Sequence, residues 1–132
     1  MIMKTTTETG RLGEDIACKH LKKSKYRIIA KNYHASHNEL DIIAENKQYI
    51  VFVEVKTRTC SPSYGLTYGT PASAVTYSKQ QRTIAAARDY LRASKNAKQP
   101  RFDVIEVILS PESTEKKPQV LEINHIEDAF TV

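Results

Sequence analysis

The chain alternates between two hydrophobic periods, one typical of helices and the other of strands. Apolar residues recur every three or four positions from Leu12 to Lys25, which predicts a first helix. A second helical pattern begins at Ser78, and Gln81 three residues later would complete a capping box. We therefore expect two helices, separated by a long stretch without helical periodicity.

The segments between and after these helices are short, rich in β-branched and aromatic residues, and predict strands. Their ranges are 26–33, 38–44, 49–58, 101–109 and 119–123, and residues 125–130 would form a short terminal segment. The resulting order is helix, three strands, helix and two strands. That order predicts an α/β domain with a mixed central sheet and flanking helices.

A predicted hairpin on either side of residues 45–48 brings acidic residues together. Side chains alternate along a strand, so Glu54 and Lys56 share one face of the second strand. With an even-length turn, Asp41 becomes a diagonal neighbour of Glu54 on that same face. An odd-length turn without a bulge would put the two carboxylates on opposite faces. The parity of the turn thus decides whether these residues can form a site.

Carboxylates gathered on neighbouring strands repel one another unless something compensates their charge. Mg²⁺ prefers oxygen ligands and is often held by one or two carboxylates together with substrate phosphates. A nearby Lys would orient water or neutralise developing negative charge. These residue types suit a metal-dependent phosphodiesterase, although a solvated sheet face with an ordinary cross-strand Glu–Lys pair is the commoner explanation of a lone Glu-Val-Lys.

Asp41 followed on the next strand by Glu54-x-Lys56 resembles the PD-(D/E)xK nuclease motif. From Gly10 to Val107 the chain resembles the YraN family of small bacterial proteins, which is similar to restriction-endonuclease-like folds and archaeal Holliday-junction resolvases. The matching stretches are Gly10-x-x-Gly13-Glu14, Asn32, Glu39-Leu40-Asp41-Ile42-Ile43, Phe52-Val53-Glu54-Val55-Lys56-x-Arg58, Lys79 and Arg101-Phe102-Asp103-Val104. The resemblance implies that fold and metal-dependent cleavage of nucleic-acid phosphodiester bonds, with structure-specific DNA in repair or recombination as one candidate substrate.

The resemblance also assigns roles to individual residues. Asp41, Glu54 and Lys56 are the expected catalytic residues, with Asp41 and Glu54 holding Mg²⁺ or Mn²⁺. Glu14 on the first helix is expected as a further acidic ligand, directly or through water, and Glu39 is a second-tier candidate. Without the resemblance, Glu14 is explained as an acid in a first helical turn, where the helix dipole favours it.

Positive charge is concentrated in the middle of the chain. The net charge is +5, yet residues 55–101 hold nine Lys or Arg against one acid, and residues 102–132 hold seven acids against two Lys. A basic segment of this kind suits an anionic partner, and a solvated helix face is the plain alternative. The residues expected to contact nucleic acid are Arg58, Lys79, Arg82, Arg88, Arg92 and Arg101.

A loop is predicted over residues 59–72, which contain two Pro and two Gly. At about 14 residues it is longer than the usual connection between elements. It begins next to Lys56 and Arg58, and its residues Tyr64 and Tyr68 would either stack on bases or anchor the loop on the core.

The 132 residues fit one domain, with residues 1–9 expected to be a flexible N-terminus. No apolar run approaches membrane-spanning length, and no secretory signal is expected. The two cysteines give no disulfide framework, so we expect a cytoplasmic protein. DNA is the expected partner of the nuclease. A non-catalytic nucleic-acid-binding module and a protein-interaction adaptor are the alternatives, and a homodimer is left open.

Overall fold

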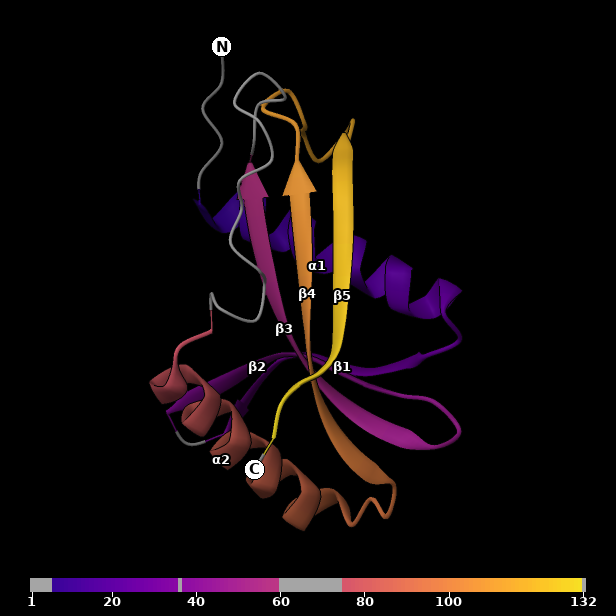
Figure 1. Cartoon of the computed structure of the whole chain (residues 1–132), viewed down its shortest axis with the longest axis vertical. Coiled ribbons are helices and arrows are strands. Elements are labelled where there is room, and N and C mark those ends of the chain that lie inside the picture. Colours follow the sequence, from indigo (N-terminus) through magenta and orange to yellow (C-terminus); the bar gives the residue numbers. More distant parts are fainter. Residues whose placement is uncertain (1–5, 36, 60–74, 132) are drawn as a thin grey trace.

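The structure is a computed structural model that describes residues 6–35, 37–59 and 75–131 (Figure 1). A single sheet has the strand order β1-β2-β3-β4-β5, in which β3 and β4 are parallel and all other neighbours are antiparallel. The elements in chain order are α1 (Thr6–Lys23), β1 (Arg27–Ala35), β2 (Asn38–Glu45), β3 (Tyr49–Thr59), α2 (Tyr77–Ser94), β4 (Gln99–Leu109) and β5 (Val120–Phe130). The predicted class and element order are confirmed. Cys60, Tyr64 and Tyr68 lie outside the described residues.

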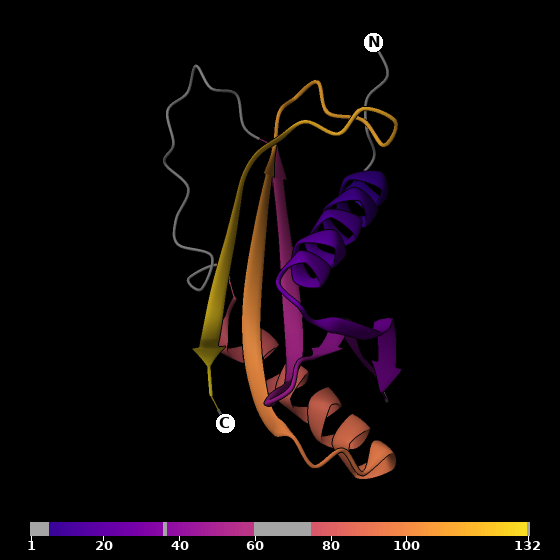
Figure 2. The same ribbon diagram turned by 90° about the vertical axis from the view of Figure 1, so that its right-hand side faces the viewer.

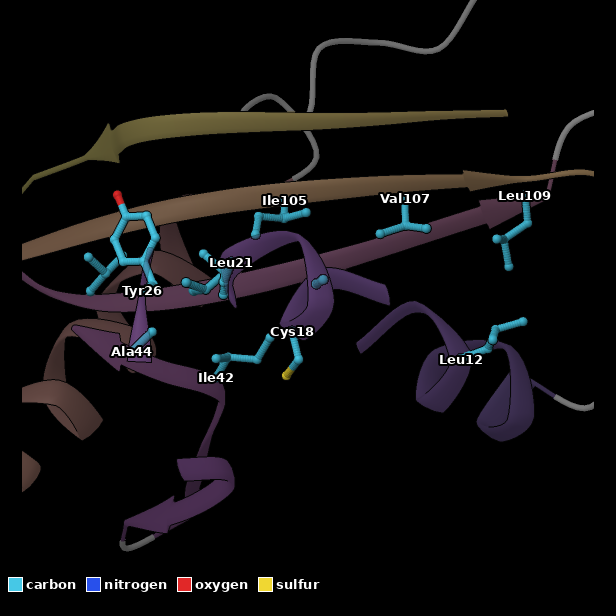
Figure 3. Packing of buried hydrophobic residues seen from close by; sticks show 12 residues of the cluster. Leu12, Cys18, Leu21, Tyr26, Ile42, Ala44, Ile105, Val107 and Leu109 are labelled. Carbon is cyan, nitrogen blue, oxygen red and sulfur yellow. The ribbon is translucent and has the colours of Figure 1, made fainter. Parts of the chain in front are cut away.

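Two hydrophobic cores lie on opposite faces of this sheet, one under each helix (Figure 2). α2 connects the parallel strands β3 and β4 as a crossover, which places it on the face opposite α1. On the α1 face, Leu21 and Tyr26 pack with Ile42 and Ile105, and Leu12 packs further along the strands (Figure 3). Among the described residues, no helix has the length and apolarity required to cross a membrane.

α1 is longer at its start than the hydrophobic period predicted and ends two residues earlier. It begins at Thr6, so residues 6–9 of the segment expected to be flexible are helical. At its end, Lys25 has a positive φ of 69°, and the Tyr26 N–H donates to the Leu21 carbonyl at 2.9 Å. This is a Schellman-type ending, which usually has Gly at the left-handed position. The burial of Leu21 and Tyr26 in one core favours it here without Gly.

The hairpin of β2 and β3 has the predicted even parity, with a register shifted by two residues. Ile42 pairs with Val53, and the turn consists of residues 47–48. One further step along the register places Asp41 directly opposite Glu54, where the sequence predicted diagonal neighbours. Both carboxyl groups therefore lie on one face, closer together than expected.

α1 approaches the sheet closely at Gly13. A Cβ atom built on Gly13 would lie 1.8 Å from Thr57 Oγ1, so no larger residue fits without displacing the helix. This contact holds the first half of α1 against the carboxyl-terminal half of β3. It also places Glu14, the next residue of the helix, beside the strands that carry Asp41 and Glu54.

Two further predictions, the cap of α2 and the division of the last strand, were wrong. The N-cap of α2 is Thr76, whose hydroxyl accepts a hydrogen bond from the Lys79 N–H at 3.1 Å, so the predicted capping box of Ser78 and Gln81 does not form. The predicted short edge strand and terminal segment are one continuous strand, β5. Asp128, with a φ of 53°, marks the irregularity that made its end look separate from the strand.

Candidate functional site

A cavity of about 480 Å³ opens where β2 and β3 separate, beneath the first turns of α1. In Figure 1, β3 runs along the vertical axis whereas β2 turns away across the lower half of the molecule. The cavity is lined by Thr9, Gly10, Glu14, Asp41, Glu54, Val55, Thr57 and Thr59. All three acidic residues expected to hold a metal therefore line a single cavity.

Asp41 and Glu54 form the centre of this site. The backbone pairing of β2 with β3 stops next to them, and the Val55 N–H donates instead to Asp41 Oδ2 at 2.9 Å. The two carboxyl groups hydrogen-bond to each other. Burial and the neighbouring charge of Asp41 raise the pKa of Glu54 to about 7. Burial also raises the pKa of Asp41, so the pair holds a proton more tightly than isolated carboxyl groups do.

Two lysines compensate part of this negative charge. Lys79 Nζ lies 3.8 Å from Glu54 Oε2, and the charges of Lys79 and Lys56 both act to lower the pKa of Glu54. Lys79 stands in the first turn of α2, where the helix dipole disfavours a cation. Its position beside Glu54 gives an electrostatic reason for a basic residue at that helix start.

Glu14 and Glu39 add negative charge around the central pair. Burial and the charge of Asp41 raise the pKa of Glu14, which accepts a hydrogen bond from the Asn32 side chain. Glu39 is exposed on β2, two residues before Asp41, and its charge acts to raise the pKa of both Glu14 and Asp41. Both residues belong electrostatically to the site.

The Asp41–Glu54 pair fits a metal ion better than the set of three expected acidic ligands, Asp41, Glu54 and Glu14. Among the described residues, no three His, Cys, Asp or Glu side chains are grouped tightly enough to hold a metal ion. The predicted set of Asp41, Glu54 and Glu14 is thus not formed as three direct ligands. Asp41 and Glu54 alone fit Mg²⁺, which is often bound by one or two carboxylates with water and phosphate completing its shell.

The predicted basic residues are distributed over three places. Lys79 joins the acidic pair, and Arg58 on β3 forms an ion pair with Glu106, its Nε lying 3.3 Å from Glu106 Oε2. Arg82, Arg88 and Arg92 are exposed along α2. Arg92 also pairs with Asp89 at 3.7 Å, and all three side chains are accessible to an anionic partner.

Arg101 is the exception, and its predicted contact with phosphate is wrong. Its side chain is only 9% exposed, and Nε and Nη2 donate to the Asp103 carboxylate at 2.9 and 2.7 Å. The guanidinium also lies over the Tyr49 ring at 4.7 Å. Because it is committed to these partners at the far end of β4 from the cavity, Arg101 is part of the structural framework.

Glu106 was not identified from the sequence. It is 1% exposed, and it is the ion-pair partner of Arg58. The available signal was a single acid within the apolar run of residues 104–109. A buried acid at such a position requires a partner, which the sequence pattern alone does not identify.

The fold and the cavity together define a class: a small mixed α/β protein with a pair of acidic residues, Glu54 buried and Asp41 half-buried, where two strands of its sheet separate. The chain belongs to the uncharacterised protein family UPF0102, whose family model matches residues 13–107. This result confirms the YraN-like resemblance at the level of the family. The matched range includes Glu14, Asp41, Glu54 and Lys56.

Several curated relatives have the same extent as this chain. A UPF0102 protein of Caldanaerobacter subterraneus subsp. tengcongensis is 46% identical over 123 residues, covering 92% of this chain and 93% of the relative. A UPF0102 protein of Chloroherpeton thalassium is 40% identical over 130 residues, covering 97% of each. A UPF0102 protein of Rhodococcus opacus is 41% identical over 122 residues, covering 92% and 94%.

Proposed function

We propose that this protein hydrolyses phosphodiester bonds in nucleic acid with the help of Mg²⁺ or Mn²⁺, and that its fold is a restriction-endonuclease-like fold similar to that of Holliday-junction resolvases. The observation that supports this proposal best is the close approach of Asp41 and Glu54, which line one cavity where β2 and β3 separate. Lys56 follows Glu54 by two residues on the same face of β3. Two carboxylates and an amine in this arrangement are the groups that such a reaction requires.

Each residue has a distinct part in the proposed reaction. Asp41 and Glu54 would hold the cation, which would polarise the scissile phosphate and favour ionisation of a bound water. Lys56 would orient the attacking water and neutralise negative charge that develops on the phosphate. Glu14 lines the same cavity and would act on the site through water.

The electrostatics of the site support binding of a cation and a phosphate together. The raised pKa values of Asp41 and Glu54 reflect a pair of buried carboxyl groups that Lys79 and Lys56 do not fully compensate. A divalent cation would reverse that effect. The exposed arginines of α2 would then contact the nucleic-acid backbone, with DNA as the expected polymer.

The direct test is a cleavage assay with labelled duplex, single-stranded, flap and four-way-junction DNA in Mg²⁺ or Mn²⁺. We expect cleavage of at least one substrate, and its loss in Asp41→Asn, Glu54→Gln and Lys56→Ala. Asp15→Asn is the matched control, because Asp15 is an exposed acid of α1 next to Glu14 that pairs with Lys31 on the surface. Cleavage that persists in Asp41→Asn would reject the site.

A non-catalytic nucleic-acid-binding module is the second candidate. It is favoured by the finding that, within the described part of the chain, no three acidic, His or Cys side chains are grouped tightly enough for a metal ion. This candidate predicts salt-dependent DNA binding that is insensitive to Mg²⁺ and to Asp41→Asn, with no cleavage of any substrate. Measuring DNA binding and cleavage on the same preparations distinguishes the two functions.

A further inference from the structure

A row of polar side chains crosses the sheet next to the acidic pair. Glu106 on β4 is in register with Lys56 on β3 and with Asn124 on β5. Residues in register on adjacent strands point to the same side of a sheet, so these three side chains share a face. Glu54 and Arg58 lie two residues before and after Lys56, on that same face.

The carboxyl group of Glu106 is almost completely buried and has few partners. Its side chain is 1% exposed, and Oε1 accepts a hydrogen bond from Asn124 Nδ2 at 3.2 Å. Oε2 accepts no hydrogen bond from any described residue, and its nearest cation is Arg58 Nε at 3.3 Å. A buried charge is costly unless it is paired, so Arg58 is its principal compensation within the described chain.

The contact engages the inner nitrogen of the Arg58 guanidinium. The closest contact of the ion pair joins Nε to Glu106, and no hydrogen bond joins the terminal nitrogens Nη1 and Nη2 to another described residue. The Arg58 side chain is 35% exposed, so its outer end reaches solvent. The two terminal nitrogens of a guanidinium form a fork whose geometry matches two oxygens of a phosphate.

We propose that Glu106 is a positioning residue: it holds Arg58 by Nε so that Nη1 and Nη2 bind a phosphate of the nucleic-acid strand that enters the Asp41–Glu54 cavity. Asn124 in turn holds Glu106 through Oε1. The inference rests on the proposed function and extends it, because it assigns one backbone phosphate of the substrate to a specific fork beside Lys56. An ammonium has no such fork, so Arg58→Lys cannot replace Arg58.

The test is a double-mutant cycle on DNA affinity. Binding of a short fluorescein-labelled duplex is measured by fluorescence anisotropy in EDTA at low salt for the wild type, Glu106→Gln, Arg58→Ala and the double variant. Charge-assisted contacts to phosphate predict a loss of about tenfold or more for Arg58→Ala. Glu106→Gln should weaken binding about threefold or more in the wild type and have no further effect in Arg58→Ala, because residues that act together are coupled.

A matched cycle combines Glu106→Gln with Arg82→Ala, since Arg82 is also an exposed arginine but lies on α2. Here the two losses should multiply, because the residues act separately. The Arg58 Nε–H resonance, observed by nitrogen-15 NMR without DNA, should move in Glu106→Gln. Arg58→Lys should bind as weakly as Arg58→Ala, whereas a contact that needs only positive charge predicts recovery.

The outcomes separate this inference from the proposed function. Suppose that the wild type binds DNA. If Glu106→Gln then loses affinity equally in the Arg58→Ala background, or if its affinity equals that of the wild type, the positioning role is overturned and the nuclease proposal stands. Absence of wild-type binding to both duplex and single-stranded DNA overturns both. If Glu106→Gln does not fold, Asn124→Ala replaces it in the same cycle. Asn124→Ala should lose less DNA affinity than Glu106→Gln, and this loss should also disappear in Arg58→Ala. A loss that is independent of Arg58 would again overturn the positioning role.

Discussion

Two buried acidic clusters in this protein differ in how their charge is compensated. At one end of β4, Asp103 accepts hydrogen bonds from Arg101, from His125 and from the Asp128 backbone N–H. Burial alone would raise the pKa of Asp103, yet the bonds from His125 and Arg101 hold it below its ordinary value. The charge of this cluster is balanced by the protein itself.

The Asp41–Glu54 pair in the cavity is the opposite case. Burial raises the pKa of Asp41 despite the hydrogen bond from the Val55 N–H and the charge of Lys79. Burial and the charge of Asp41 raise the pKa of Glu54 despite the charges of Lys79 and Lys56. The comparison shows that burial of an acid does not by itself identify its role. A cluster with balanced charge stabilises the fold. A cluster with uncompensated charge destabilises it, and a bound cation would remove that destabilisation.

The largest effect is expected from the balanced cluster. Asp103→Asn removes the closest counter-charge of the Arg101 guanidinium and leaves it only Glu127, 3.7 Å from Nη1 among the described residues, although Arg101 is only 8% exposed. Removing one partner of a buried pair should lower the free energy of unfolding by about 3–5 kcal/mol. Urea denaturation measures this loss. Asp89→Asn is the control, since Asp89 pairs with Arg92 at 3.7 Å on the surface of α2 and should change stability by less than about 1 kcal/mol.

The unbalanced Asp41–Glu54 pair predicts that the stability of the metal-free protein depends on pH. Between its ordinary pKa of 4.5 and about 7, Glu54 stays protonated in the folded state while the unfolded chain has released the proton. The stability of the metal-free protein should therefore fall as pH rises through this window and level off above it. The loss is expected to be about 3 kcal/mol.

Glu54→Gln should abolish most of this slope and make the metal-free protein more stable than the wild type at pH 8. Urea denaturation in EDTA at several pH values between 5 and 8 measures both effects. Glu39→Gln is the control, because Glu39 is exposed and contributes only a secondary charge to the site. A wild-type stability that rises with pH across this window would contradict the unbalanced state of the pair.

The sequence predicted the parts of this site that depend on local rules. Alternation along β3 placed Glu54 and Lys56 on one face, and the parity of the turn placed Asp41 with them. The register itself was two residues off, because the polar residues 45–48 accommodate a two-residue turn at 46–47, which was expected, as well as the observed turn at 47–48. Packing between strands decides between such registers, and that information is not local.

Long-range partners were the parts that the sequence could not supply. Arg101 looked like a free basic residue, yet its partner Asp103 and its neighbours Tyr26 and Tyr49 bury it. Glu106 looked like part of an ordinary strand, yet it pairs with Arg58 on another strand. In both cases the role of a charge depends on residues that only the tertiary fold brings close.

A metal ion should reduce the difference between the two clusters. Mg²⁺ at ten times its dissociation constant should raise the stability of the wild type by about 1.4 kcal/mol and its melting temperature by a few degrees. Asp41→Asn should abolish this shift, and Asp15→Asn should retain it because Asp15 pairs with Lys31 on the surface. Differential scanning fluorimetry with Mg²⁺ and Mn²⁺ measures it. Melting curves that neither ion moves, with or without DNA, would favour the binding module.

The smallest effect on stability is expected at the exposed arginines of α2, which belong to neither cluster. Arg88→Ala combined with Arg92→Ala should change the free energy of unfolding by less than about 1 kcal/mol, because both side chains are exposed. Their effect should instead be on DNA affinity. Each phosphate contact removed lowers the slope of log affinity against log salt by about 0.9 for duplex DNA, so the double variant should lose up to about two units of slope.

Lys19→Ala combined with Lys22→Ala removes the same number of charges from the exposed face of α1 and is the matched control. Anisotropy titrations at several salt concentrations should show a reduced slope for the α2 variant and an almost unchanged slope for the α1 variant. Equal losses in both variants would mean that net charge, and not the α2 face, attracts the nucleic acid. Wild-type affinity that does not vary with salt would exclude α2 as the binding surface, because neutralisation of phosphates always releases counterions.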